Sequence, residues 1–401
     1  MEKNMKTIYL DYAATTPVKQ EVLAEMLPYF SEKFGNPSSL YAMGQESREA
    51  LEKARAQVAS LIGAKPREIS FTSSGTEADN WAVAGAARSR RKKGNHIITT
   101  KIEHHALLHT CQALEKEGFA VTYLDVDSCG RVDPAELEAA ITEGTILVSI
   151  MYANNEVGTI QPIKELAAIA KKHGVLFHTD AVQALGNMDI DVKELGVDLM
   201  SVSAHKIYGP KGIGALYIRQ GVAIANLVYG GAQENKKRAG TENLGGIVGF
   251  GKAAELAGRD LQQHQAKLAG LRDYFIEQVQ QRIPEVDVNG SLEHRLPGNA
   301  NLIFNYVEGE ALLLYLDARG ICASTGSACS SASFSPSHVL LAMGLPPEKV
   351  YSSIRFTLGD FTTKEDLDHV TEELVRIVEQ LRSFSPYNKD RPMESRQVLR
   401  A

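Results

Sequence analysis

The sequence predicts an α/β protein with a large domain, built on a mainly parallel seven-stranded sheet covered by helices, and a smaller α+β domain. Short apolar runs alternate with amphipathic helical patterns over residues 69–218, which is typical of βαβ crossovers. Near residue 256 this pattern gives way to one long helix followed by shorter strands. A chain of 401 residues is also longer than one hydrophobic core usually supports.

Seven short apolar runs are the expected strands of the large domain. They are Ile69–Thr72, His96–Thr99, Ala120–Leu124, Ile146–Tyr152, Val175–His178, Leu199–Ser201 and Gly214–Ile218. Apolar spacing predicts a helix over Gln45–Ile62, ended by Gly63, and another over Ile163–Lys172. In a parallel sheet of this kind, ligands bind beyond the carboxyl ends of the strands.

The second domain is expected to begin with a long helix whose apolar residues recur at helical spacing as far as Ile283. Strands are expected at Ala300–Phe304 and Arg355–Thr357, and a last helix carries Leu367 and Leu381. We therefore expect a large domain over residues 15–255 and a small domain over residues 1–14 and 256–382. Residues 383–401 are polar and are expected to form a loosely held tail.

Composition excludes several classes of protein. Apolar residues make up 44% and charged residues 23% of the chain, as in soluble globular proteins. The net charge of -6 argues against direct nucleic-acid binding, and the basic run Arg88–Lys93 is interpreted as a solvated helix end. Neither a membrane-spanning apolar run nor the apolar region of a secretory signal is present, so a cytoplasmic protein without membrane contact is expected.

Four cysteines occur in the chain, at positions 111, 129, 322 and 329, without a CxxC pair. Cysteines this sparse predict reduced thiols and neither a disulfide framework nor a zinc site. One of the four thiols is a candidate reactive group.

Lys206 is the first candidate for chemistry. It follows an apolar run and precedes a Pro/Gly turn, so its backbone is expected to be held rigidly at a strand end. A free lysine has a pKa of about 10.4, which desolvation or a nearby cation lowers. Lys206 is therefore a candidate to bind the aldehyde of pyridoxal phosphate, and the alternative is an ordinary surface lysine.

Two further candidates lie at predicted strand ends. Gly75 and Thr76 open a helix, whose N–H groups and positive dipole end can hold a phosphate, although an ordinary N-cap explains the same residues. Asp180 ends a strand that should be buried, so it needs a cationic partner such as a protonated pyridine nitrogen. The alternatives for Asp180 are a structural ion pair or a helix cap.

Two more stretches follow strands in the same way. His104 offers an imidazole that can stack on a ring or move protons, whereas one of two adjacent histidines is often only a surface residue. Asn154 and Asn155 offer neutral amides, which suit ligand binding and an Asx-turn equally well.

Together these stretches resemble the cysteine desulfurases of the NifS/IscS type, within the class V aminotransferases and the fold-type I pyridoxal phosphate enzymes. The resemblance extends from Tyr9–Pro17 to Ser352–Gly359, and its most specific motifs are Ser203–Gly212 and Ser324–Ala332. It implies a fold-type I transferase. The implied reaction removes sulfur from L-cysteine and gives L-alanine and a persulfide on Cys329.

The resemblance also implies a role for each candidate residue. Lys206 would bind pyridoxal 5′-phosphate covalently, with His104 stacked on the ring, Asp180 at the ring nitrogen and Gln183 at the phenolic oxygen. The phosphate would be held by Gly75, Thr76, Ser203 and His205, and by Thr241 of a second subunit. Asn155 and Arg355 would bind the substrate carboxylate, for which a guanidinium is well shaped. An obligate homodimer follows.

Cys329 specifies the reaction in this resemblance. It lies in a Ser/Ala/Gly-rich stretch over 323–336, and loops of this length are usually functional or disordered. The thiolate would attack the substrate sulfur, with His104 as proton acceptor and Lys206 as the base at the α-carbon. No metal site is expected, apart from transient contact of Cys329 with an iron–sulfur cluster or sulfur acceptor. We expect this loop to be more mobile than its flanks.

The sulfur acceptor is open at this stage, because an iron–sulfur scaffold, a tRNA-thiolating enzyme or a cofactor pathway would each serve. Alternative functions are a selenocysteine lyase or another lyase or aminotransferase on the same scaffold, and a catalytically idle sulfur-relay protein. Residues 230–238 depart from the family, since Asn235–Lys237 stands where more glycine is usual. The tail also differs, so no specific partner is carried over.

Overall fold

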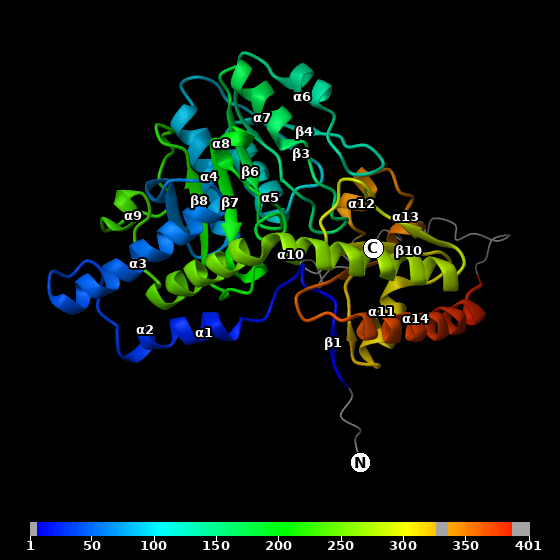
Figure 1. Cartoon of the computed structure of the whole chain (residues 1–401). Coiled ribbons are helices and arrows are strands. Elements are labelled where there is room, and N and C mark those ends of the chain that lie inside the picture. Colours follow the sequence, from blue (N-terminus) through cyan, green and yellow to red (C-terminus); the bar gives the residue numbers. More distant parts are fainter. Residues whose placement is uncertain (1–5, 326–335, 387–401) are drawn as a thin grey trace.

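The computed structural model describes residues 6–325 and 336–386, and it contains the large sheet that the sequence predicts (Figure 1). The strands are β2 (Ile69–Thr72), β3 (His96–Thr100), β4 (Ala120–Leu124), β5 (Thr145–Ser149), β6 (Leu176–Asp180), β7 (Leu199–Ser203) and β8 (Gly214–Ile218). Their order across the sheet is β2-β8-β7-β6-β5-β3-β4. All neighbours from β4 to β7 are parallel, and β8 is antiparallel to β7 and β2. The predicted fold class is confirmed.

Several strand ends differ from the prediction: β6 and β7 each continue two residues further, to Asp180 and Ser203, and β5 stops earlier. The run Ile146–Tyr152 is apolar throughout, but β5 ends at Ser149, because the chain then bends toward a turn at Asn154. The backbone N–H groups of Ile150 and Tyr152 still donate to carbonyl groups of β6. Ile150, Met151 and Tyr152 are buried like the strand itself, so the whole run is buried although the strand ends at Ser149.

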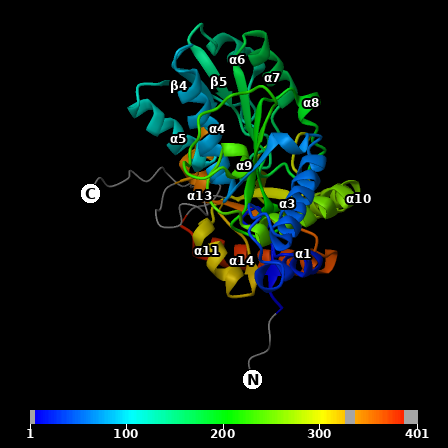
Figure 2. The same ribbon diagram turned by 90° about the vertical axis from the view of Figure 1, so that its left-hand side faces the viewer.

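Helices cover both faces of the sheet (Figure 2). α3 (Ala42–Leu61), α7 (Ile163–Lys172) and the first part of α10 (Leu244–Arg282) pack on one face, and α4 (Gly75–Arg90) and α5 (His105–Lys116) on the other. Neighbouring strand residues alternate between the two cores: Phe177 and Met200 join the first, and Leu176 and Leu199 the second. Strands buried on both faces read as continuous apolar runs, which is why the sequence revealed them.

A second core forms around the later part of α10. It contains β9 (Val286–Val288), β10 (Asn299–Phe304), α11 (Gly309–Asp317), β12 (Ser353–Thr357) and α14 (Lys364–Phe384). The strand β9 was not predicted, since it has three residues and none is buried. Ile8 and Leu10 of the N-terminal segment join this core, where β1 (Ile8–Tyr9) pairs with β11 (Ile321–Cys322). The division into domains at residues 14 and 255 stays a prediction.

Short helices connect these elements. They are α1 (Gln20–Met26), α2 (Pro28–Ser31), α6 (Pro134–Ala140), α8 (Val192–Leu195), α9 (Gln233–Lys236), α12 (His338–Ala342) and α13 (Pro347–Tyr351), with 3₁₀ turns at Pro66–Glu68 and Ala204–Lys206. α14 reaches Phe384, two residues into the predicted tail, and the tail from residue 387 onward lies outside the described residues. Within the described ranges, no helix has the length and apolar character needed to cross a membrane.

An unusual turn occupies the segment where the sequence lacks the expected glycine. Glu234, Asn235 and Lys236 have φ values of 45°, 56° and 65°, a left-handed backbone that costs non-glycine residues about 1–3 kcal/mol each. The buried Glu234 accepts hydrogen bonds of 2.6 and 2.9 Å from Arg55 and one of 2.9 Å from the Phe71 N–H. This buried ion pair fixes the strained turn against β2.

We predict that Glu234→Ala lowers the free energy of unfolding by about 3–5 kcal/mol, because it leaves the Arg55 guanidinium buried without its main partner. Urea denaturation followed by circular dichroism measures the loss. Glu52→Ala is the matched control: it removes a carboxylate from the same Arg55, but Glu52 is exposed, so the expected loss is below about 1 kcal/mol. Equal losses in the two variants would contradict the prediction.

Candidate active site

Lys206 ends a 3₁₀ turn directly after β7, at the carboxyl edge of the sheet. Its Nζ donates to the backbone carbonyl oxygens of Ala13 and Ala14, at 2.7 Å for Ala14. Gln183 Nε2 donates to the same Ala13 carbonyl at 3.0 Å. The structure therefore brings Lys206 and Gln183 together on the N-terminal segment.

Asp180 is the last residue of β6 and is buried, as predicted. Burial raises its pKa to about 6, against the Val182 N–H bond of 2.9 Å and the charge of Lys206, which both lower it. Asp79 of α4 is also buried, and burial and the charge of Asp180 raise its pKa well above the ordinary value. A cation placed beside Asp180 would favour its ionised form and so lower the pKa that burial raises.

Sequence reasoning missed Asp79 and the buried His178. The His178 ring nitrogens bond Ser149 Oγ at 2.8 Å and Ser201 Oγ at 3.0 Å. Burial lowers the pKa of His178 to about 3, so the ring is uncharged beneath Asp180. The pattern of neither element gave a signal, because Asp79 within helix α4 and His178 within strand β6 are each explained equally well as ordinary interior positions.

His104 lies at the start of α5, where its Nδ1 accepts the Ala106 N–H at 3.1 Å. Burial, and then the charge of Lys206, lower the pKa of His104 to about 4, so the ring is uncharged at neutral pH. His105 is half-buried and packs 4.8 Å from the ring of His338, so neither of the adjacent histidines is only a surface residue.

Three of the predicted phosphate residues, Gly75, Thr76 and Ser203, lie where β2, β6 and β7 end. A Cβ atom on Gly75 would lie 2.8 Å from Val182 Cγ2 and 3.5 Å from Ser203 Cβ. Ser203 Oγ is buried and has no hydrogen-bond partner among the described residues. The helix cap is Ser74, whose Oγ accepts the Glu77 N–H, so Gly75 and Thr76 form the first turn itself. A buried donor beside a helix N-terminus suits an anion.

The other two predicted phosphate residues, His205 and Thr241, lie in different surroundings. His205 bonds Thr15 Oγ1 at 3.2 Å, and burial with the charge of Lys206 lowers its pKa to about 4. Thr241 is exposed, between α9 and α10. Its segment is tied to the first turn of α4 by Arg238, which binds both carboxylate oxygens of Glu77 at 2.8 and 3.0 Å. This ion pair was not predicted, since its partners are far apart in sequence.

Arg355 of β12 is buried, and the structure brings it to Asn155. Its guanidinium donates to the Asn155 carbonyl oxygen at 3.1 Å and to Asp11 Oδ1 at 2.7 Å. Asn154 forms the Asx-turn, since its Oδ1 accepts the N–H groups of Glu156 and Val157. The two alternatives for this stretch thus apply to different asparagines, and Asp11 is a partner that the sequence did not reveal.

Cys329 lies outside the described residues, as do residues 326–335 of the predicted loop, so its mobility stays a prediction. The residues on either side of this gap, up to 325 and from 336, are described. Ser324 shares backbone hydrogen bonds with Arg355, and Ser337 Oγ donates to the carboxylate of Glu156, the residue after Asn155. Both flanks therefore border the Arg355 and Asn155 site.

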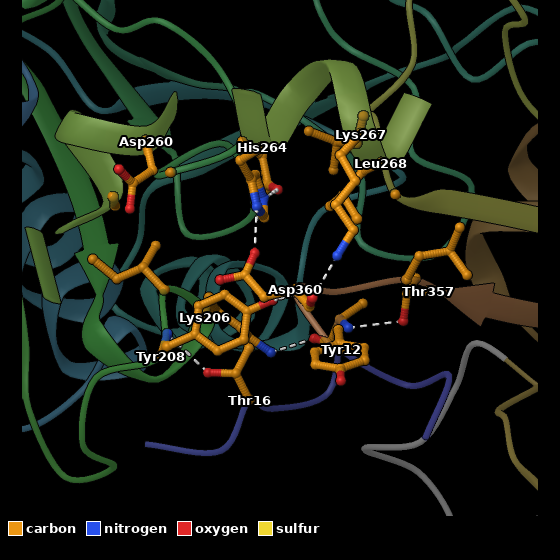
Figure 3. A pocket seen from close by; sticks show the side chains of 18 of the residues that line it. Tyr12, Thr16, Lys206, Tyr208, Asp260, His264, Lys267, Leu268, Thr357 and Asp360 are labelled. Atoms are coloured by element: carbon orange, nitrogen blue, oxygen red, sulfur yellow. Dashed lines mark hydrogen bonds and ion pairs between the residues drawn. The ribbon is translucent and has the colours of Figure 1, made fainter. Parts of the chain in front are cut away.

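A cavity of about 330 Å³ adjoins Lys206 on the side of α10 (Figure 3). Its lining combines Lys206 and Gln183 from the sheet edge with residues of α10 and of the loop after β12. The carboxyl edge of the sheet, the second core and α10 meet here.

Comparison with known proteins places this site in context. Residues 8–370 match the aminotransferase class-V family. A cysteine desulfurase IscS from Dictyoglomus turgidum is 56% identical over 385 residues, which cover 96% of this chain and 98% of that protein. A cysteine desulfurase IscS from Methanosarcina thermophila is 56% identical over 381 residues, covering 95% of this chain and 94% of that protein.

Solved structures of similar proteins have the same fold. A NifS-like protein superposes with a TM-score of 0.89 at 40% identity, covering 94% of this chain and 100% of that chain. A structure of SspA in complex with cysteine gives a TM-score of 0.79 at 36% identity, covering 89% and 100%. Because the family match spans most of the sequence, this chain belongs to the aminotransferase class-V family.

Proposed function

We propose that this chain is a cysteine desulfurase that removes sulfur from L-cysteine and gives L-alanine and a persulfide on Cys329. The observation that carries the proposal is the arrangement of Lys206, His104, Asp180 and the Ser203 hydroxyl around one sheet edge, with Arg355 facing it from the second core. The relatives named cysteine desulfurase, which are 56% identical over nearly the whole chain, support the same activity.

The residues at this edge fit pyridoxal 5′-phosphate. The unpartnered Ser203 hydroxyl and the first turn of α4 would hold its phosphate, and Asp180, whose burial disfavours an isolated negative charge, would hold its ring nitrogen. The uncharged His104 would cover its ring. When bound, the cofactor supplies an electron sink for the substrate α-carbon.

The chain's own groups then have defined tasks. Lys206 Nζ would hold the cofactor, and its free amine would take the proton from the substrate α-carbon. Arg355 holds the substrate carboxylate, and Asp11, which it binds in this structure, keeps the guanidinium oriented toward Asn155. The low pKa of His104 keeps the ring uncharged above about pH 5, with Nδ1 as the nitrogen that accepts the Ala106 N–H.

The sulfur step is assigned to Cys329. Its thiolate forms an S–S bond with the substrate sulfur as the substrate C–S bond breaks, and the electron pair of that bond passes to the carbon, which is protonated and leaves as alanine. An ordinary cysteine has a pKa of about 8.5, so a proton acceptor such as His104 is needed at neutral pH.

We propose a homodimer in which Thr241 completes the partner's phosphate site. Exposed apolar side chains gather between the end of α1 and the start of α3, on α2 and on the loop that follows it: Leu27, Phe30, Phe34, Leu40, Tyr41 and Met43. The ring of Phe30 lies against Gly245, four residues after Thr241, so the apolar surface continues to that segment. A surface of this kind marks an association site.

The persulfide sulfur would pass to a protein acceptor in the cytoplasm, an iron–sulfur scaffold or a tRNA-thiolating enzyme. Cys329 is the proposed point of contact with it. No direct contact with nucleic acid or membrane is proposed.

We predict that Cys329→Ala reduces alanine and sulfide production from cysteine, in the presence of a thiol reductant, by roughly 100-fold or more, because the acceptor of the sulfur is lost. The visible absorbance of the bound cofactor should be unchanged. Cys322→Ala is the control, since this half-buried thiol in β11 has no proposed role. Full activity of Cys329→Ala would refute the desulfurase mechanism, and loss of activity on cysteine but not on selenocysteine would favour a selenocysteine lyase.

A hybrid dimer tests the role of Thr241. Lys206→Ala and Thr241→Ala subunits, each impaired alone, are mixed after unfolding and refolding together. A hybrid then contains one site with both changes and one with neither, so tight cofactor binding and activity should return at about half of the hybrid's sites. If Thr241 serves its own subunit, mixing restores nothing.

A further inference from the structure

The cavity beside Lys206 is lined by charged groups that already bind one another. Lys19, His264 and Lys267 all contact Asp360, and Asp260 pairs with its neighbour Arg259. Because these charged groups already form ion pairs and hydrogen bonds with one another, they give no indication of a bound ligand. Their arrangement instead joins the elements on either side of the cavity.

Asp360 is the residue at which these contacts meet (Figure 3). It follows β12, the strand of Arg355, and its carboxylate binds Lys19 Nζ at 2.5 Å and His264 Nδ1 at 2.6 Å. Its carbonyl oxygen accepts Lys267 Nζ at 2.5 Å. Burial would raise the pKa of Asp360, but the bonds from His264 and Lys19 outweigh burial and lower it to about 2.

Two chains of hydrogen bonds lead from Asp360 to the active site. The Asp360 N–H donates to Tyr208 Oη at 2.7 Å, and Tyr208 lies two residues after Lys206 with a left-handed φ of 64°. A strained non-glycine residue persists only where its surroundings hold it, and here its hydroxyl is held by Asp360 and its ring by Lys19, 4.7 Å from the centroid.

The second chain passes through His264 of α10. Its Nε2 faces Asn187 Oδ1 at 3.2 Å, and Asn187 Nδ2 donates to the carbonyl oxygen of Gln183 at 3.0 Å. That second bond fixes which atom of Asn187 is the oxygen. Both ring nitrogens of His264 therefore face oxygen atoms, Asp360 Oδ1 on one side and Asn187 Oδ1 on the other.

We propose that Asp360 and His264 are positioning residues, a latch that sets the place of Arg355 relative to Lys206 and Gln183. This inference rests on the proposed function of those three residues. The latch ties the end of the Arg355 strand to the Lys206 turn through Tyr208 and to Gln183 through Asn187. Loosening it separates the group that holds the substrate carboxylate from the lysine that reacts at the α-carbon.

Steady-state kinetics on the cofactor-loaded dimer measure this role. His264→Ala and Asp360→Asn are expected to raise KM for cysteine by about 5- to 20-fold and to change kcat by less than about threefold, because they misplace the carboxylate site and leave the reacting groups present. The double variant should be little worse than either single variant, since both remove one linkage. Asp260→Asn is the matched control: Asp260 lines the same cavity, but its ion pair among the described residues is with Arg259 and not with Asp360 or His264, so KM should be unchanged.

Hydrogen exchange of the cofactor-free full chain separates this inference from the proposed function. Asp360→Ala keeps the backbone N–H that binds Tyr208 but releases His264 and Lys19, and Lys19 lies over the Tyr208 ring. It should therefore speed exchange by about tenfold in two separate segments, β12 and residues 206–212, and Asp260→Asn in neither. This result would support the latch even if the chain did not act on cysteine. Unchanged KM with faster exchange only next to residue 360, or equal effects of Asp260→Asn, would overturn the proposal.

Discussion

The geometry of the site depends on the backbone of the N-terminal segment from Asp11 to Thr16, which lies between the two cores. Its carbonyl groups at Ala13 and Ala14 accept from Lys206, and Thr16 is bonded to the backbone of His205 and Tyr208. Toward the second core, the Ala13 N–H donates to Thr357 Oγ1 and Asp11 binds Arg355. One short segment thus contacts the predicted cofactor lysine and the predicted substrate arginine.

This placement explains why the pKa values of the site move in opposite directions. The edge of the sheet is buried, so it lowers the pKa of His104 and raises those of Asp180 and Glu103, the latter to about 8. Each shift favours the uncharged form, as desolvation requires. A ligand that brings a cationic nitrogen to Asp180 would restore the negative charge of that carboxyl, so binding and ionisation are coupled.

The sequence predicted the parts of this arrangement that have local signals. Strands buried on both faces are visible as apolar runs, and residues at their carboxyl ends are candidates by topology alone, which located Asp180, His104 and Lys206. The roles of Ser203, Asn155, Arg355 and Cys329 came from resemblance to a family. For Ser203, Arg355 and Cys329, nothing in the local spacing would have indicated these roles, whereas Asn155 was already a candidate because it follows a predicted strand.

Contacts between distant segments could not be predicted, and they decide the relative placement of the groups. Asp11 and Arg355 are 344 residues apart, and His264 and Asp360 are 96 apart. Each of these residues would be read from its neighbours as an ordinary charged position. The same applies to the left-handed turn at Glu234, where a distant arginine compensates a backbone that local preferences oppose.

The segment Asp11–Thr16 and the Asp360 latch hold the two cores in different ways. The first holds Lys206 and Thr357 through backbone groups at Ala13 and Ala14, whose positions change little when a side chain is replaced. The latch relies on a carboxylate, an imidazole and a phenol, each of which a single substitution removes. If substrate binding adjusts the distance between Arg355 and Lys206, the movement should therefore occur at the latch, while the N-terminal segment acts as the fixed side of the site.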